Sequence, residues 1–429
     1  MRPEPVMTAA PNRSVGPAPP LARIAGLLTP RRILTHAALL AVCVWSLYAF
    51  DLATPGMRDR AGHLKGADFV HFYTAGRLLQ AGRVRALYDP PALATDQQHL
   101  IPQSTGAYFV ASYGPQVYLP FSLLARLPYA WAAITWALLN CALYLACCYA
   151  VFRCCPRLQP YAAIIFVLAV AFPGFFGLIA FGQSSGPALL LLTLGYLCLR
   201  SQRMFLAGLT IGSLIYKPQL GVAAAVVFLL AAEWKLIAGA LVAAAAQLSF
   251  SWAWFGTAVM REYMQSLLRT GHMMAWIEPR LYQMHSLRGF WLLLLPWRNF
   301  AEALYVVSAG AVLVLAVLCW RGRGPLSLRY AALLLATVLT APHLMIYDLV
   351  ILAPAWLLLA DWFLGHRQAA AGPALAVFLY LAYALPLLEP LAKLTHVQLS
   401  VLGFVALQWW VWRAAGNNPA SGPQHLQTA

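Results

Sequence analysis

The chain has 429 residues, of which 62% are hydrophobic and only 10% are charged, and its formal net charge is +16. Soluble domains carry roughly 25% charged residues, so this composition excludes an ordinary soluble protein. Its apolar runs are continuous and recur at membrane length, which indicates a polytopic all-α membrane protein and argues against an outer-membrane β-barrel. Cytoplasmic loops of such proteins collect Lys and Arg, and the chain has no basic run of five or more residues. We therefore attribute the positive charge to membrane topology and expect no nucleic-acid partner.

Three regions are expected along the chain. Residues 1–30 are rich in Pro, Ala and Arg and predict a flexible cytoplasmic tail, and residues 414–429 predict a second one. Residues 31–413 form the transmembrane domain between them. Its first apolar run, about 33–52, is too long for a signal-peptide core and follows two arginines. We interpret this run as a retained span with its N-terminus inside.

The next segment, 53–127, predicts a large outer loop. It contains the stretch GADFVHFYTAGRLLQAGRVRALY at 66–88, whose apolar residues recur at helical spacing, as in an interfacial amphipathic helix. Asp68 falls in the first turn of that helix. It is either a helix N-cap or a general base whose pKa is set by partial burial, and the two roles are compatible. The apolar end of the loop, broken by Pro115 and Pro120, predicts a second interfacial helix.

The rest of the chain alternates apolar runs with short loops. The run 204–232 is divided by Lys217-Pro218, and one continuous helix would place Lys217 near mid-bilayer at a cost of roughly 2.5–3.5 kcal/mol. We therefore expect two short helices meeting near the outer face. A second large outer loop is expected at 256–300. Basic loops then fall inside on a count of twelve spans, at about 33–52, 128–152, 160–180, 186–199, 204–232 (two), 235–255, 301–320, 327–341, 348–364, 370–388 and 397–412.

Many of the polar residues that are costly in a membrane map to the outer side on this count. Each alone is explained by snorkelling or loop capping, but together they favour an outward-facing site. The chain has no P-loop, no GxGxxG after a strand and no HExxH, which argues against a nucleotide-fuelled pump and a membrane zinc protease. The outward polar group consists of Asp68, His71, Asp89, Gln183, Lys217, His285, His343 and Asp348.

An acidic base beside cations at a membrane-facing entrance suits transfer from a lipid-linked phosphate. Asp68 would take a proton from an acceptor hydroxyl, while Lys217, His343 and an arginine such as Arg77 would hold the phosphate leaving group. No carboxylate cluster typical of a Mg²⁺ site is present, and no cysteine pair has metal-ligand spacing. We expect neither a metal nor another cofactor.

Five segments resemble the glycosyltransferases of family 87, in the order in which that family carries them. The stretch 66–90 is similar to the signature "DF..Y.AG..L..G...LYD". The other four are YGPQVYLPFSLLARLP at 113–128, FGQSSGPALLLLTLGYLCLRSQRMFLAGLTIGSLIYKPQ at 181–219, MHSLRGF at 284–290 and APHLMIYDLVILAP at 341–354. Together they cover about residues 33–365. The family contains GT-C-type enzymes, including polyprenol-phosphate-mannose-dependent mannosyltransferases.

The resemblance implies a GT-C-like bundle of about twelve transmembrane helices in the bacterial inner membrane, with the active site facing the periplasm. A hexose, mannose in those relatives, would pass from a polyprenyl-phosphate sugar to a glycolipid or glycan acceptor with inversion. It places the catalytic carboxylate on Asp68, and functional cations on Lys217 and His343. Ser184-Ser185 and Met284-His285 depart from the family pattern, so the sugar and the acceptor stay open.

Further side chains are expected to contact the substrates or the lipid. Aromatic residues would line the sugar or lipid path, although an interfacial aromatic belt explains them equally. The expected contacts are Tyr73, Asp89, Tyr113, Gln183, Trp276 and His285.

Two other classes of protein compete with the enzyme. A transporter or lipid flippase predicts broken helices in matching halves, and the sequence shows one broken run without a partner. A non-catalytic assembly subunit would leave Asp68 replaceable.

Overall fold

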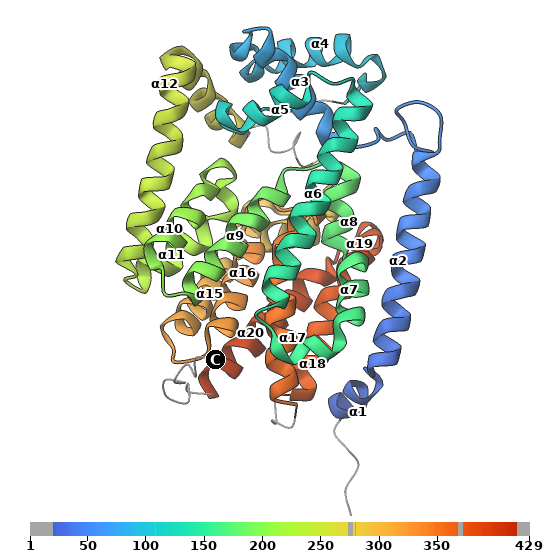
Figure 1. The fold of residues 1–429 in the computed structure, drawn as a ribbon, viewed down its shortest axis with the longest axis vertical. Coiled ribbons are helices and arrows are strands. Elements are labelled where there is room, and N and C mark those ends of the chain that lie inside the picture. The colour runs from blue at the N-terminus through green and yellow to red at the C-terminus, as the bar shows by residue number, and fades with distance from the viewer. Residues whose placement is uncertain (1–19, 108, 273–277, 279, 368–371, 418–429) are drawn as a thin grey trace, which may run out of the picture.

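The computed structural model describes residues 20–107, 109–272, 278, 280–367 and 372–417. It is built from helices, with a large bundle and a smaller layer of helices at one end (Figure 1). The expectation of an all-α polytopic membrane protein is confirmed. Residues 1–19 and 418–429 of the predicted tails lie outside the described residues.

Two helices open the described chain at the edge of the bundle. Helix α1 (Pro20–Leu27) lies within the segment expected as a tail and packs against α18. Helix α2 (Pro30–Leu52) begins at Thr29, whose hydroxyl accepts from the backbone N–H of Arg32, with Pro30 at the first helical position. It packs on α7, and Ala37 alone among its residues is buried, so most of its surface is left for lipid.

Residues 53–127 form the layer at the end of the bundle, which we name the cap. Its elements are α3 (Ala67–Gln80), η1 (Val84–Tyr88), α4 (Pro90–Leu100), η2 (Pro102–Ser104), η3 (Pro115–Tyr118) and α5 (Leu119–Leu124). The predicted helices of this loop are present, but α3 is buried along most of its length. An aromatic core holds it, in which the rings of Phe72 and Phe121 stack 4.5 Å apart.

The bundle follows in two halves. The first contains α6 (Tyr129–Phe152), η4 (Pro156–Tyr161), α7 (Ala162–Ala171), α8 (Pro173–Phe181), α9 (Ser185–Arg200), α10 (Met204–Gly212), η5 (Ser213–Tyr216), η6 (Pro218–Leu220) and α11 (Val222–Leu230). The second contains η7 (Leu281–Gln283), α14 (Leu287–Leu294), α15 (Arg298–Arg321), α16 (Leu326–Thr340), η8 (Ile346–Leu352), α17 (Ala353–Gly365), α18 (Gly372–Ala384), η9 (Leu385–Leu388), α19 (Glu389–Thr395) and α20 (Leu399–Asn417). Helix α16 is buried nearly all round, as expected for an apolar helix at the centre of a core.

One long helix joins the bundle to the cap. Helix α12 (Trp234–His272) packs tightly on α10, where Gly208 lets the backbone of Leu236 approach, and it is kinked at Gly256. Beyond the kink, Val259 and Tyr263 belong to the aromatic core of the cap. An ion pair of 3.0 Å between Arg85 and Glu262 ties the two together. The cap therefore stands between α2 and α12 (Figure 1).

The structure does not support twelve membrane spans. Within the described residues, six helices are long and apolar enough to cross a membrane, and a seventh span results if the pair 156–171 and 173–181, bent by 43°, counts as one. The other apolar helices are shorter than the roughly 20 residues that a 30 Å hydrocarbon layer needs. Pro173 breaks one expected span, and the two short helices predicted on either side of Lys217-Pro218, α10 and α11, have nine residues each. The run expected to end at 255 continues in α12.

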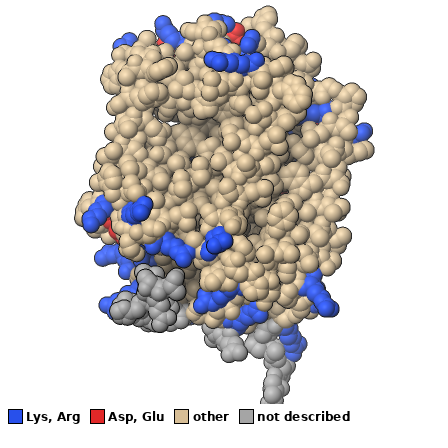
Figure 2. Space-filling view, in the orientation of Figure 1, with Lys and Arg blue, Asp and Glu red and all other residues tan. Residues whose placement is uncertain are grey.

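Charge divides the two ends of the molecule. On the face shown in Figure 2, most Lys and Arg side chains lie toward the end away from the cap, whereas the cap carries both signs. The same view shows a recess between the cap and the bundle. Several polar side chains of the expected site gather where the cap meets the bundle.

Candidate active site

Asp68 stands in the first turn of α3, but it is not the N-cap. That position belongs to Gly66, whose φ of 61° lies in the left-handed region and which makes no side-chain cap hydrogen bond. Oδ2 of Asp68 instead accepts a hydrogen bond of 2.9 Å from Nε2 of Gln183. Among the described residues, nothing hydrogen-bonds the second oxygen, Oδ1. The structure therefore removes the simple capping interpretation and leaves one carboxylate oxygen free to act.

The surroundings of Asp68 change its acidity. Burial raises the pKa of Asp68 to about 6, while the hydrogen bond from Gln183 and the charges of Lys217 and His343 oppose the rise. The Asp348 carboxylate adds to it. The result is a carboxylate that is mostly ionised at neutral pH and still basic enough to take a proton.

The turn between α8 and α9 fixes the amide of Gln183. Its oxygen accepts from the backbone N–H of Ser184 at 2.8 Å, and a backbone N–H can only donate. The amide nitrogen must therefore face Asp68 as a donor, which favours the charged carboxylate. Gly182, at φ 68°, makes the turn, and a side chain there would collide with Phe69 of α3.

Lys217 lies at the break between η5 and η6 and is completely buried. Its Nζ lies 2.5 Å from Oδ1 of Asp348 and 2.9 Å from Oγ of Ser185, and Ser185 donates to the same Asp348 oxygen at 2.6 Å. The ring of Tyr347 lies 5.3 Å away. The charge of Lys217 is thus matched by a buried partner before any substrate arrives.

His343 belongs to a short segment, 341–348, that crosses the site from α16 to η8. The segment is tied to the residues between η7 and α14 by a β-bridge between Met284 and Met345 and by a hydrogen bond of 3.0 Å from the His285 N–H to the Leu344 carbonyl. Nδ1 of His343 lies 2.9 Å from Oε1 of Glu278. The histidine is half-buried and within electrostatic range of Asp68.

The sequence model of glycosyltransferase family 87 matches residues 109–346, more than half of the chain. The chain belongs to glycosyltransferase family 87. Comparisons with curated proteins and with solved structures found no match. As a family 87 glycosyltransferase, the protein acts on a sugar donor and an acceptor. Gln183, Lys217 and His343 lie inside the matched region, and Asp68 precedes it.

Four of the residues predicted for the site of this glycosyltransferase come together, namely Asp68, Gln183, Lys217 and His343. Tyr113 reaches them from the cap, since it lies within electrostatic range of Lys217 and Tyr347. These five side chains come from segments far apart in the sequence. The fold of the family 87 protein therefore builds one polar centre out of five regions.

Other predicted residues lie elsewhere. Arg77 is exposed near the far end of α3 and contacts Gln80 and the Ala125 carbonyl. The hydroxyl of Tyr73 donates to the Leu127 carbonyl inside the cap core. Asp89 is exposed at the start of α4.

The last two predicted contacts belong to the stretch of sequence between α12 and α14. His285 is fully buried, with Nδ1 2.8 Å from Oγ of Ser400 and Nε2 3.4 Å from Oε2 of Glu389, so it links this stretch to α19 and α20. Trp276 lies outside the described residues. Their roles in substrate binding therefore gain no support from these positions.

The structure adds two residues to which no role was assigned, Ser185 and Glu278, and gives a partner to Asp348, which belonged to the outward polar group. Ser185 and Asp348 complete the Lys217 cluster, and Glu278 pairs with His343. Asp348 carried a signal, as an acidic residue in an apolar run, and Ser185 was visible as a departure from the family pattern. Nothing in the sequence connects Glu278 to His343, 65 positions away.

In the part of the chain that the structure describes, no three His, Cys, Asp or Glu side chains come close enough to hold a metal ion.

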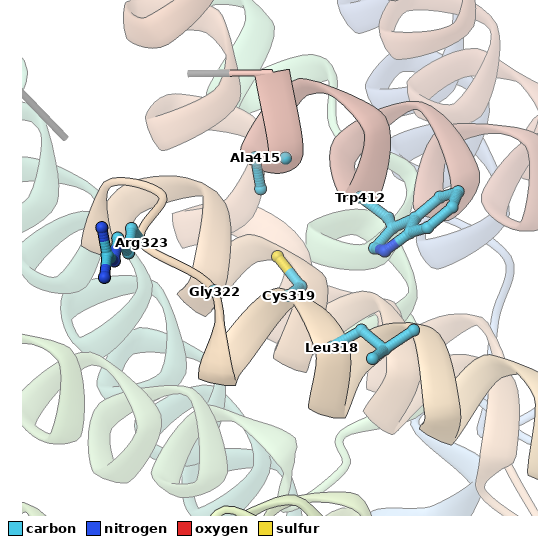
Figure 3. Close-up of a pocket in the computed structure, with 7 residues that line it drawn as sticks. Leu318, Cys319, Gly322, Arg323, Trp412 and Ala415 are labelled. Atoms are coloured by element: carbon cyan, nitrogen blue, oxygen red, sulfur yellow. The ribbon is translucent and has the colours of Figure 1, made fainter. Parts of the chain in front are cut away.

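A cavity of about 240 Å³ lies away from the site, between the C-terminal ends of α15 and α20 (Figure 3). Its lining includes Leu318, Cys319 and Trp412, with Arg323 at the side.

Proposed function

We propose that this family 87 protein is an integral-membrane hexosyltransferase that uses a polyprenyl-phosphate sugar as donor. It transfers the hexose, with mannose as the first candidate, to a hydroxyl of a glycolipid or glycan acceptor. The observation that supports this proposal is the environment of Asp68. Its pKa is raised, Gln183 donates a hydrogen bond to Oδ2, and Lys217 and His343 lie within electrostatic range. That combination suits a general base that works beside a departing phosphate.

The proposed reaction is a single displacement. Asp68 takes the proton of the acceptor hydroxyl, and the hydroxyl oxygen attacks the anomeric carbon. The bond from that carbon to the phosphate oxygen breaks, and its electron pair stays on the phosphate. The donor phosphodiester, with one negative charge, becomes a polyprenyl phosphate with up to two. One attack from the face opposite the leaving group inverts the anomeric centre.

Cations near the leaving phosphate stabilise its growing charge. His343 is half-buried with Nε2 unoccupied among the described residues, which makes it the first candidate to contact the phosphate. Lys217 supplies positive potential, although its direct contact is with Asp348. The position of Arg77 on the far end of α3 gives no support to a contact with the phosphate.

We propose that the cap faces the periplasm. Lys and Arg prevail at the end away from the cap, and cytoplasmic ends of membrane proteins carry this bias (Figure 2). In a GT-C-like arrangement the catalytic carboxylate belongs to the first outer loop, and we assign that role to Asp68 in the first turn of α3. The recess between cap and bundle then opens at the outer membrane boundary, where a lipid-linked sugar presents its head group.

The test uses the full chain in lipid nanodiscs with radiolabelled polyprenyl-phosphate mannose and candidate glycolipid acceptors. We expect transfer by the native protein, a loss of about 10³-fold or more in Asp68→Asn, and near-native transfer in Asp59→Asn, a matched change elsewhere in the cap. Equal transfer by the native protein and Asp68→Asn would remove the mechanism. Failure to bind or use any polyprenyl-phosphate sugar would remove the donor class and favour the transporter.

A further inference from the structure

Four polar side chains, each in contact with the next, form a row that ends at His343. Nδ1 of His343 lies 2.9 Å from Oε1 of Glu278, and Nη1 of Arg288 lies 2.7 Å from the other oxygen of Glu278. Arg288 continues to Glu302, with Nη2 2.8 Å from Oε1 and Nε at 3.1 Å. The Glu278 side chain is only 3% exposed, whereas Glu302 is 33% exposed. Glu278 is therefore the buried link between the arginine and the histidine.

The charges of Arg288, Glu278 and Glu302 do not balance one another. One arginine stands between two carboxylates, which leaves one negative charge without a partner. Glu302 can share its charge with solvent, whereas Glu278 is buried and meets Arg288 through one oxygen only. The imidazole of His343 lies 2.9 Å from its other oxygen, where a proton on the ring would add a second favourable charge. Besides Glu278, the charged group that the structure places within electrostatic range of His343 is Asp68 of α3, while Asp348, on the segment that follows His343, is paired with Lys217.

The contact with Glu278 also determines which imidazole nitrogen of His343 can contact a substrate. Glu278 occupies Nδ1, which leaves Nε2 as the ring nitrogen available to a ligand. Arg288 holds the backbone of the same segment, because its Nη1 also reaches the carbonyl of Pro342, the residue before His343. The arginine thus secures both the carboxylate and the segment that carries the histidine.

We propose that Glu278 is the positioning residue for His343, which it holds protonated with the Nε2–H directed at the phosphate of the lipid-linked donor. This inference rests on the proposed function and names the residue behind its cation. As the carbon–oxygen bond breaks, the Nε2–H donates to the phosphate oxygen that receives the electron pair. No proton need be transferred, and Glu278 balances the imidazolium throughout. Carboxylates that hold a histidine through its other nitrogen act in this way elsewhere.

The first arm of the test is kinetic. Glu278→Gln keeps the size and the acceptor oxygen but removes the charge. Glu302→Gln is the matched control, because Glu302 contacts the same arginine but lies at the other end of the row. We expect Glu278→Gln to lose about 10–100-fold in kcat. The basic limb of its pH–rate profile should move to lower pH, while Glu302→Gln stays near native. In a His343→Gln background, Glu278→Gln should cost nothing further.

The second arm does not depend on activity. Diethyl pyrocarbonate modifies neutral imidazole, so its rate at His343, followed by mass spectrometry at pH 6–7, should rise severalfold in Glu278→Gln and not in Glu302→Gln. Unchanged labelling, an unmoved basic limb or additive losses in the double variant would each overturn the role of Glu278. Absence of transfer by the native protein with normal labelling shifts would overturn the proposed function alone. If Glu278→Gln does not fold, Glu278→Asp, which keeps the charge but withdraws it from Nδ1, is judged by the same labelling.

Discussion

The amide nitrogen of Gln183 donates a hydrogen bond of 2.9 Å to the carboxylate of Asp68, across 115 positions of the chain. Because the Ser184 N–H holds the amide oxygen, the donor cannot turn away. The interaction favours the ionised form of Asp68 against the effect of burial.

Gln183→Leu should therefore raise the pKa of Asp68 above its value of about 6. A hydrogen bond to a charged group contributes about 1.5–3 kcal/mol, so the acid limb of the pH–rate profile should move up by about one to two pH units. Activity should largely recover at pH 8 or above. Gln97→Leu, which removes a buried glutamine bonded to the Ala107 carbonyl in the same cap, is the control. An acid limb that stays in place in Gln183→Leu would contradict the assignment.

Asp68→Asn should abolish transfer without weakening the fold. The folded carboxyl has a pKa of about 6 instead of 3.8, so between about pH 4 and 6 the unfolded chain has lost a proton that the folded chain keeps. Stability falls as pH rises through that window, by up to about 3 kcal/mol, and the asparagine variant lacks this fall. Thermal unfolding in detergent at pH 4.5 and pH 7 measures it. A variant less stable than native at pH 7 would show that the charge supports the fold.

The Lys217–Asp348 pair should behave as a unit. Lys217→Met leaves a buried carboxylate unpaired and should cost about 3–5 kcal/mol of stability, whereas Lys217→Met with Asp348→Asn should recover most of it. Transfer should stay low in the double variant, since the positive potential near the phosphate is gone. A double-mutant cycle of unfolding and activity measures both. Additive losses of stability would argue against the pair.

Gly256 at the kink of α12 should resist substitution for reasons of backbone alone. Its φ of 79° and ψ of 168° lie in a region nearly exclusive to glycine, and a Cβ there would meet nothing within 4 Å. Gly256→Ala should cost about 1–3 kcal/mol. Gly310→Ala, in the regular helix α15 and equally unobstructed, should be neutral or stabilising. Equal melting temperatures for the two variants would show that the kink relaxes.

The orientation of the cap can be measured directly. In a variant with the eight native cysteines replaced, Arg85→Cys in the cap should react with an impermeant maleimide in intact cells. Arg323→Cys, at the opposite end, should react only after permeabilisation. The reverse pattern would place the candidate site in the cytoplasm.

The sequence predicted the fold class and part of the site, but not the number of spans. Lys and acidic residues are costly in an apolar chain, so Asp68, Lys217, His343 and Asp348 stood out and could be grouped by side. Apolar composition does not distinguish a short helix buried in protein, such as α9 or α16, from one long enough to cross the bilayer. The predicted twelve spans failed for this reason.

The partners of these residues were harder to foresee. Glu278 carries no local pattern that relates it to His343, and Arg77 appeared suitable because it shares a helix with Asp68. Nine residues at about 100° each turn a helix through about two and a half revolutions, which places Arg77 on the opposite face. Tertiary contacts decide both cases.

The assembly of the polar centre from five distant segments limits how the protein can be handled. A detached cap, expressed as a water-soluble fragment, would contain Asp68 and Tyr113 but neither Gln183, Lys217, His343 nor Asp348. Shortening the chain to ease crystallisation or screening would therefore discard the chemistry along with the hydrophobic bulk. Inhibitor discovery has to start from the intact polypeptide in a lipid or detergent environment.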